Sequence, residues 1–393
     1  AFQVLLDVQG MNAFRVRHLE NALLNFEQVT SLKQPLDLHL KRYFQAHRQL
    51  GSADRAWICT QIYELVRWRG LLDYVTPPPS TWSSRLRTFF ISDRWRAHTM
   101  NPRLPPHIRC SFPEALFRRI ENALGTKKAI QVCNVLNEAP PTFLRVNTNQ
   151  ITRDRVYKFL QSKGVDVEKC VNSPYGLMLN HKQRLLDLPE YKQGLIEIQD
   201  EASQIVSFKV QAMPGDKVLD YCAGSGGKTL AFGPQMENSG KIYLHDAREY
   251  MLNVAKIRLR KAGITNYVLL PPSHPHLSRL QGQMDWVVCD VPSTATGALR
   301  RNPDIKWNYS DARLFELVGQ QREIFEQALG YMKPDKGRIV YVTCSVLDEE
   351  NVQQLKYFCQ KHGLVMTEPP FHALPQTKGM DGFFCATMER RQD

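Results

Sequence analysis

Hydrophobic residues recur at helical spacing through the N-terminal third of the chain. Ile58, Ile62 and Leu65 stand at i, i+4 and i+7, which places them on one face of a helix. Similar stripes run through residues 12–75, and the helical pattern returns over 113–137. The pattern therefore predicts helices packed around a shared core in this part of the chain.

The second half of the chain shows a different pattern, in which short hydrophobic runs alternate with helical stripes. The runs predict strands at 217–220, 241–244, 267–270, 286–289 and 339–342. Strands that alternate with helices are typical of a mostly parallel sheet with helices on both faces. Ligands of such sheets bind at the carboxyl ends of the strands, so the residues that follow each run are the first candidates for a site.

A boundary separates these two regions at Pro140-Pro141. Beyond it, residues 142–147 have a strand pattern, residues 153–163 have a helical pattern, and a polar, turn-rich stretch continues to Gly194. We therefore expect three parts. They are a helical region at 11–137, a small α/β module at 140–195 and an α/β domain at 196–393.

Length and composition place the chain among ordinary globular proteins. It has 393 residues, of which 43% are hydrophobic and 23% charged. No apolar run approaches the roughly 18 residues of a membrane-spanning helix. The nine cysteines show no C-x-x-C or C-x-x-H spacing, which argues against a disulfide framework and against a metal site. We therefore expect a cytoplasmic monomer without a metal and without a membrane partner.

The charge of the chain favours a polyanionic partner such as nucleic acid. The net charge is +12, and residues 1–139 hold 19 Lys and Arg against 11 Asp and Glu, a local excess of +8. Within 82–109, arginines are interleaved with Trp82, Phe89 and Trp95. This mixture suits RNA, because guanidinium binds phosphate and aromatic rings stack on unpaired bases. The alternative is a long linker packed on the helical region, and the sequence leaves both interpretations open.

The strongest local signal for a binding site is VLDYCAGSGGKT at 218–229. A strand ends at Asp220 and a glycine-rich turn at 224–227 opens a helix, so backbone N–H groups can approach a carboxylate or phosphate closely. The next strand ends at Asp246, and an acidic residue there typically accepts hydrogen bonds from ribose hydroxyls. Binding of a dinucleotide and binding of S-adenosylmethionine both fit this pattern.

Two further strand ends carry side chains that could do chemistry. The run 286–289 is followed by Asp290, Pro292 and a loop of small polar residues, and the run 339–342 is followed by Cys344. Asp290 could bind a planar heterocycle or cap its own loop. Cys344 could be inert filler or a thiolate nucleophile, and its position at the carboxyl end of a strand favours the nucleophile.

Six segments carry a resemblance to a known family. They are QPLDLHLKRYFQAHRQLGSADRAWICTQIYELVRWR at 34–69, IQDEASQ at 198–204, DYCAGSGGKT at 220–229, DVPSTATGALRRNPDIKW at 290–307, VTCSVLDEEN at 342–351 and DGFFCATMER at 381–390. In order and spacing they resemble the Sun/NSUN family of RNA cytosine-5 methyltransferases, and most closely its bacterial RsmB type, which methylates small-subunit ribosomal RNA. The resemblance implies a Rossmann-like S-adenosylmethionine-dependent methyltransferase domain, a small α/β module and an all-helical, NusB-like N-terminal domain.

The resemblance also implies a reaction and the residues that carry it out. In the family, a cysteine attacks carbon 6 of cytosine and so activates carbon 5 for methylation, and the matching residue here is Cys344. Asp290 would hold the cytosine edge, and we expect Lys228 to supply positive charge that lowers the pKa of Cys344. The residues expected to bind S-adenosylmethionine are Cys222, Ala223, Gly224, Ser225, Gly226, Gly227, Lys228, Asp246 and Asp290. The RNA partner would be ribosomal RNA, with transfer RNA as the other candidate.

Two departures from the family pattern bear on activity. The family's Pro-Cys motif reads Pro292-Ser293 here, and a serine hydroxyl transfers protons poorly near neutral pH. Residues 269–275 read LLPPSHP, without the acidic residue that the family carries near the adenine. We therefore expect an RNA cytosine-5 methyltransferase in which Ser293 slows release of the product. The alternative is a catalytically silent RNA-binding or ribosome-assembly factor with the same fold.

Overall fold

The computed structural model describes residues 12–30, 34–91, 93–181 and 185–391. They form two compact units. The helical unit contains the described residues up to Ala139 together with Ala298–Arg313, and the α/β unit contains Pro140–Gly297 and Leu314–Asp393 as far as they are described. The sequence had placed 298–313, here named the inserted segment, in the α/β domain. The predicted start of the helical region, residue 11, lies outside the described residues.

The helical unit consists of helices and short turns, and residues between 19 and 95 form a shared hydrophobic core. Its helices are α2 (Ala13–Thr30), α3 (Leu36–Ala46), α4 (Ser52–Arg67), α5 (Arg69–Val75), α6 (Trp82–Ile91), η1 (Asp93–Met100), α7 (Pro106–Arg109), α8 (Glu114–Leu124) and α9 (Thr126–Leu136). Ile58, Ile62 and Leu65, which define the predicted stripe, are at most 1% exposed and belong to this core. The predicted helical character is therefore confirmed, whereas the likeness to NusB stays a prediction.

Residues 82–109 are part of the helical core rather than a free surface of aromatic rings. Trp82 and Trp95 are only 2% and 3% exposed, and the buried Arg85 places its Nε 2.5 Å from Oδ1 of the partly exposed Asp73. Of the two interpretations that the sequence left open, packing on the helical region holds for these two tryptophans, because their rings fill the core. The exposed arginines of the segment are Arg87, Arg94, Arg96 and Arg103.

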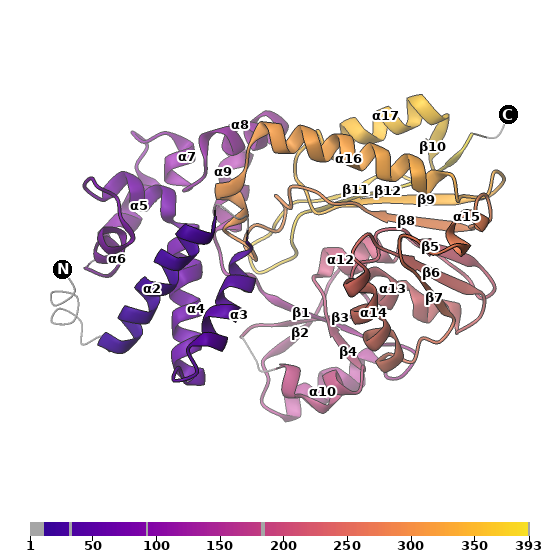
Figure 1. Cartoon of the computed structure of the whole chain (residues 1–393), viewed down its shortest axis with the longest axis horizontal. Helices are drawn as coiled ribbons and strands as arrows, with labels where there is room; N and C mark the ends of the chain where they lie inside the picture. The colour runs from indigo at the N-terminus through magenta and orange to yellow at the C-terminus, as the bar shows by residue number, and fades with distance from the viewer. Residues whose placement is uncertain (1–11, 31–33, 92, 182–184, 392–393) are drawn as a thin grey trace. The chain divides into compact units, whose positions relative to one another are not determined.

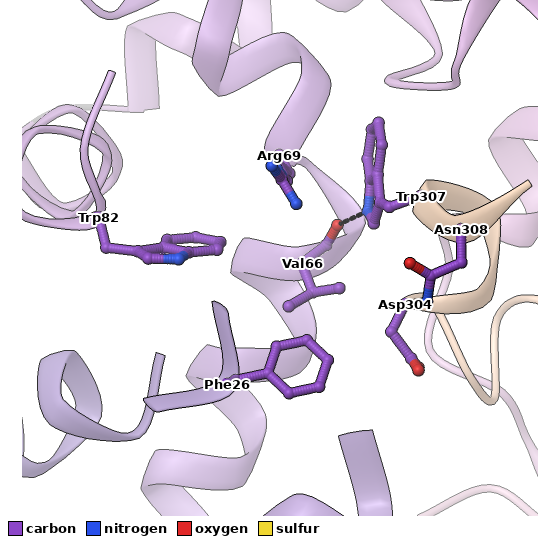
Figure 2. A pocket seen from close by; sticks show the side chains of 7 residues that line it. All are labelled: Phe26, Val66, Arg69, Trp82, Asp304, Trp307 and Asn308. Carbon is purple, nitrogen blue, oxygen red and sulfur yellow. Dashed lines mark hydrogen bonds between the residues drawn. The ribbon is translucent and has the colours of Figure 1, made fainter. Parts of the chain in front are cut away.

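The inserted segment is anchored by polar side chains that are buried inside the helical unit. Lys306 Nζ donates hydrogen bonds to the backbone oxygen of Arg67 at 2.7 Å and to Asn137 Oδ1 at 2.8 Å. Trp307 Nε1 donates to the Val66 oxygen at 2.6 Å, beside a cavity of about 10 Å³ that has room for about one water molecule (Figure 2). Such contacts explain why this segment packs with the helices although its sequence follows a strand of the α/β unit.

The N-terminal part of the α/β unit contains a small antiparallel sheet. Its strands are β1 (Thr142–Val146), β2 (Val167–Lys169), β3 (Gly176–Leu179) and β4 (Ile196–Ile198), in the order β2-β3-β1-β4, with α10 (Arg153–Ser162) between β1 and β2. The predicted strand and helix of this module are both present, within one residue of their predicted ends. Asn147 Nδ2 donates a hydrogen bond to the oxygen of Ala262 at 2.8 Å. This bond joins the module to the rest of the α/β unit, which contains a second, larger sheet.

The larger sheet has the order β10-β12-β9-β8-β5-β6-β7, and β11 pairs with β12. Its strands are β5 (Lys217–Asp220), β6 (Lys241–His245), β7 (Tyr267–Leu270), β8 (Trp286–Asp290), β9 (Arg338–Thr343), β10 (Leu364–Met366), β11 (Phe371–Ala373) and β12 (Phe383–Arg390). The five neighbouring strands β9, β8, β5, β6 and β7 run parallel to one another, whereas β12 runs antiparallel to β9. All five predicted strands are confirmed, and so is the Rossmann-like α/β class.

Helices cover both faces of this sheet (Figure 1). They include α12 (Glu201–Ser207), α13 (Gly227–Phe232), α14 (Glu249–Lys261), α15 (His276–Arg279), α16 (Asp311–Leu329) and α17 (Val352–His362). Alternate residues of one strand enter different cores, because side chains of a strand point to opposite faces. Val288 packs in the core that contains residues of α13 and α14, and Val287 packs in the core that contains residues of α16 and α17. Within the described ranges, no helix combines the length and apolarity needed to cross a bilayer.

Candidate active site

The glycine turn connects β5 to α13 in a conformation that requires glycine. Asp220 ends the strand and Gly227 begins the helix. Gly224 and Gly226 have φ angles of 50° and 79°, in the left-handed region. A Cβ on Gly226 would also lie 3.2 Å from the Cβ of Ala255. The turn therefore brings its backbone close to α14 without a side chain in the way.

The other turn residues are held by neighbouring elements. The Ala223 N–H donates to the oxygen of His245 at 2.9 Å, which fixes the turn against the end of β6. Both the carbonyl oxygen and Oγ of Ser225 accept hydrogen bonds from Arg258 Nη1, at 2.8 and 2.7 Å. Cys222 is partly buried, and burial raises the pKa of its thiol well above the ordinary value. The turn is therefore rigid before any ligand binds.

Asp246 lies against this turn, one residue after β6. Its Oδ2 accepts a hydrogen bond from the Gly224 N–H at 2.8 Å. Its Oδ1 accepts from the N–H of Arg248 at 2.9 Å and from Arg248 Nε at 3.0 Å. Burial alone would raise the pKa of Asp246, but these hydrogen bonds outweigh burial and hold the pKa below its ordinary value. The carboxylate is therefore ionised and faces the glycine turn, as ribose binding requires.

Lys228 and Asp290 form an ion pair at the carboxyl ends of β5 and β8. Lys228 Nζ lies 2.8 Å from Asp290 Oδ2 and also donates to Ser203 Oγ at 3.2 Å. Burial alone would lower the pKa of Lys228, but the Asp290 carboxylate outweighs burial and raises it. The ammonium is therefore charged, and much of its charge is already neutralised by its partner.

Cys344 and Ser293 face each other across neighbouring strands. Cys344 directly follows β9, Ser293 follows β8, and the two strands pair in parallel. The distance from Ser293 Oγ to Cys344 Sγ is 3.4 Å, which is within hydrogen-bond reach for sulfur. The Gly297 N–H also donates to the Cys344 oxygen at 2.9 Å. Two residues 51 positions apart in the sequence therefore meet at one point of the sheet edge.

Lys228 lowers the pKa of Cys344 as expected, but the net pKa of this thiol is raised above its ordinary value. The pKa of the Cys344 thiol is raised to about 11, chiefly by burial, and the hydrogen bond from Ser293 offsets only part of this rise. The carboxylates of Asp290 and Glu350 contribute to the rise, and the Lys228 ammonium lowers the pKa by less than either of them raises it. The physical reason is therefore burial of the thiol, which outweighs the positive charge of Lys228.

The raised pKa predicts how the reactivity of Cys344 depends on pH. Only the thiolate is alkylated, so the rate at Cys344 should rise about tenfold per pH unit from pH 7 to pH 9.5, without a plateau. Iodoacetamide labelling followed by mass spectrometry of the Cys344 peptide measures this rate. A plateau at or below pH 8 would contradict the raised pKa. Cys359, which is partly exposed and distant in sequence from the other motif residues, serves as an internal reference.

A buried carboxylate that the sequence reasoning missed connects the loop after β9 to the loop after β8. Glu350 is 0% exposed, and its Oε1 accepts hydrogen bonds from the Thr294 N–H at 2.8 Å and from Gln321 Nε2 at 3.0 Å. Thr294 Oγ1 donates to Oε2 at 2.5 Å, and Gln321 Nε2 also donates to the Pro292 oxygen. Glu350 therefore fixes the loop that carries Ser293. A glutamate six residues after the cysteine was the only signal in the sequence.

Asp220 is a second functional candidate that the sequence reasoning passed over. Its Oδ2 accepts a hydrogen bond from Thr229 Oγ1 at 2.7 Å, whereas its buried Oδ1 has no hydrogen-bond partner in the described part of the chain. Burial raises the pKa of Asp220 to about 7. A hydrophobic strand that ends in an acidic residue directly before a glycine turn was the signal that could have found it.

The site combines a parallel sheet and a glycine turn with a carboxylate and a cysteine at the carboxyl ends of the strands. These features define a Rossmann-like methyltransferase. Residues 208–389 match the family described as 16S rRNA methyltransferase RsmB/F, and residues 112–185 match the ferredoxin-like domain of RsmF/B-like proteins. The chain belongs to the RsmB-type branch of the Sun/NSUN family, as its motifs predicted. S-adenosylmethionine is the cofactor of this family, which agrees with the expected cofactor.

Named relatives and solved structures agree with this assignment. The chain is 32% identical over 290 residues to ribosomal RNA small subunit methyltransferase B of Photorhabdus laumondii, covering 71% of this chain and 66% of that one. It is 30% identical over 308 residues to the protein of that name from Pasteurella multocida, covering 74% and 68%. A methyltransferase homolog from Pyrococcus horikoshii superposes with a TM-score of 0.63 and 25% identity, over 73% of this chain and 98% of that one. The chain thus spans about two thirds of the length of the curated relatives.

Proposed function

We propose that this protein methylates carbon 5 of cytosine in RNA, with ribosomal RNA as the substrate. The observation that carries the proposal is the meeting of Cys344 with Ser293 at 3.4 Å, beside the ion pair of Lys228 and Asp290. A nucleophile, an acceptor for an amino group and a positive charge are the three groups that attack on a cytosine ring needs. All three come from the carboxyl ends of the parallel strands or from the helix that follows β5.

The residues present fit S-adenosylmethionine. Asp246 offers an ionised carboxylate for the ribose hydroxyls. The buried Oδ1 of Asp220 has no partner within the described residues, and the ammonium of the methionine part would satisfy it. When bound, the cofactor supplies a methyl group on a positively charged sulfur. The loop 269–275 contributes no acidic side chain for the adenine, so the affinity should rest mainly on the carboxylates of Asp246 and Asp220.

Cys344 would begin the reaction by forming a bond from Sγ to carbon 6 of cytosine. The thiol gives its proton to water, the thiolate bonds to carbon 6, and the electron pair of the carbon 5–carbon 6 double bond shifts toward carbon 4 and the ring nitrogen N3, so that carbon 5 becomes the nucleophilic end of an enamine. The Asp290 carboxylate is suited to accept hydrogen bonds from the exocyclic amino group of cytosine. The Lys228 ammonium would stabilise the negative charge that develops on the ring.

Release of the methylated base requires a proton acceptor. The proton on carbon 5 must leave before the bond from Cys344 to carbon 6 can break and restore the aromatic ring. In the family pattern position 293 supplies this acceptor, and Ser293 lies beside Cys344, but a hydroxyl is a poor base near neutral pH. Release should therefore be slow, with water as the proton acceptor in place of a positioned general base.

The choice of ribosomal RNA rests on family membership and on charge. The relatives in this branch are named for ribosomal RNA of the small subunit. The helical unit exposes Arg87, Arg94, Arg96 and Arg103, which can neutralise phosphates. Transfer RNA is the alternative substrate, and a direct comparison of the two RNAs as methyl acceptors would decide between them.

The proposed function is tested by the product of the reaction. Incubation of the full chain with ribosomal RNA and S-adenosylmethionine carrying a labelled methyl group should yield labelled 5-methylcytosine after digestion to nucleosides. Label in another nucleoside, or in none while RNA and cofactor are both bound, would contradict it. In the second case the protein would be a silent RNA-binding or ribosome-assembly factor, an alternative that Ser293 and the loop 269–275 favour.

The cofactor site makes a separate prediction for Asp246. Replacing Asp246 by alanine should weaken binding of S-adenosylhomocysteine by about 1.5–3 kcal/mol, because charge-assisted hydrogen bonds to the ribose are lost. Titration calorimetry measures the change. Asp216→Ala is a matched control, since Asp216 is an aspartate of the same domain whose side chain accepts a hydrogen bond from the N–H of Met213 at the other end of β5. Equal affinities for the Asp246 variant and the unmodified protein would remove Asp246 from the site.

A further inference from the structure

The acceptor sites of the Asp246 carboxylate are all occupied by the chain itself. A carboxylate offers about four lone-pair positions. Oδ1 accepts from the N–H and from Nε of Arg248, and Oδ2 accepts from the N–H of Gly224 and, at 3.3 Å, from Arg248 Nη2. Two of the four donors are backbone groups that hold Asp246 in place. The other two belong to one guanidinium group.

The guanidinium binds Asp246 in the pattern that a ribose would use. Nε takes one position on Oδ1 and Nη2 takes one position on Oδ2, so the guanidinium bridges both oxygens. The neighbouring hydroxyls of a ribose also present two donors to the two oxygens of one carboxylate. The guanidinium and a ribose cannot bind Asp246 at the same time, because the backbone N–H groups of Gly224 and Arg248 occupy the other two lone-pair positions.

We propose that Arg248 is an affinity-determining residue of the cofactor site, in which its guanidinium occupies the ribose position on Asp246 and must leave before the cofactor can bind. This inference rests on the proposed function, since it takes Asp246 as the ribose acceptor. The apparent affinity of a site is reduced by the fraction of molecules in which it is open. Arg248 therefore makes cofactor binding weaker than the preformed turn alone would allow.

The surroundings of Arg248 permit this displacement. The Arg248 side chain is 57% exposed, whereas that of Asp246 is 5% exposed. The guanidinium can therefore turn into solvent while the carboxylate stays in place. A partly exposed ion pair of this kind contributes little free energy. Removal of the guanidinium should therefore increase the affinity for the cofactor, and only by a small factor.

The test is titration calorimetry of S-adenosylhomocysteine with the full chain and its Arg248→Met variant. Methionine keeps an unbranched stem and removes both side-chain donors, so the dissociation constant should fall roughly two- to fivefold. Arg248→Lys should give an intermediate affinity, because one ammonium cannot bridge both oxygens as the planar guanidinium does. Arg260→Met, at an exposed position near the end of α14, the helix that follows Arg248, should leave the affinity unchanged.

Three outcomes would overturn the inference. An unchanged or weaker affinity of Arg248→Met, with Asp246→Ala still weaker than the unmodified protein, would show that Arg248 does not compete for the ribose position. It would leave the proposed function intact. Equal affinities of Asp246→Ala and the unmodified protein would remove the shared acceptor. No binding by any folded variant, with folding checked by thermal unfolding, would overturn both the inference and the proposed cofactor.

Discussion

Replacing Cys344 by alanine is expected to reduce methylation of RNA by at least about 10⁴-fold, because the proposed mechanism loses its nucleophile. The same change should abolish any covalent complex between protein and RNA on a denaturing gel. Thermal unfolding of the variant should stay close to that of the unmodified protein, since Cys344 is only partly buried. Methylation that survives this change would refute Cys344 as the nucleophile.

The partner experiment restores the group that the family carries at position 293. Ser293→Cys should raise turnover by roughly 10²-fold, the range typical of a positioned general base. It should also lower the steady-state amount of the covalent complex, because the complex is released faster. The double variant should behave like Cys344→Ala alone, since groups that act in sequence are not additive. Unchanged turnover in Ser293→Cys would mean that another group or water already carries out release.

Replacing Glu350 by alanine should have the second-largest effect, although Glu350 does not touch the substrate in the proposed mechanism. The change leaves the N–H and hydroxyl of Thr294 and the amide of Gln321 without their buried acceptor. The expected loss is about 3 kcal/mol or more in the free energy of unfolding. In the remaining folded protein, kcat should fall by about 10²-fold because Ser293 and Cys344 lose their alignment.

Controls separate a positioning role of Glu350 from a general loss of folding. Glu349→Ala, in the neighbouring and only partly buried position, should keep kcat and stability close to the unmodified protein. Glu350→Gln keeps one acceptor oxygen and should recover part of kcat at an unchanged KM for RNA. A Glu350→Ala protein that is unstable but fully active at low temperature would show that the residue serves folding alone.

The sequence predicted the parallel sheet because its strands carry a readable signal. Buried on both faces, β8 and β9 are continuous hydrophobic runs that end in Asp290 and Thr343, and such runs mark central strands. The position of the inserted segment could not be predicted in this way. Its packing depends on Lys306, a lysine that is 1% exposed and bonded to Asn137 from a distant helix. Composition would place such a residue at the surface.

The residues of the candidate site were predictable as a set, but their electrostatics were not. Motif order pointed to Lys228, Asp290 and Cys344, and the structure brings these residues to one edge of the sheet. The charge on Lys228 was expected to lower the pKa of Cys344 below its ordinary value, whereas burial of the thiol outweighs it and Lys228 is itself paired with Asp290 at 2.8 Å. Pairing of this kind depends on side-chain positions to within about an ångström. The spacing of residues along the sequence does not determine positions at that precision.

The central claim is that Cys344 bonds to carbon 6 of a cytosine in RNA. RNA that carries fluorine at carbon 5 of its cytosines tests it directly, because fluorine cannot leave as a proton and release is blocked whatever residue stands at position 293. After incubation with S-adenosylmethionine and digestion of protein and RNA, mass spectrometry should find a methylated fluorocytidine on the peptide that contains Cys344. Attachment to another residue, or no attachment with RNA and cofactor both bound, would contradict the claim.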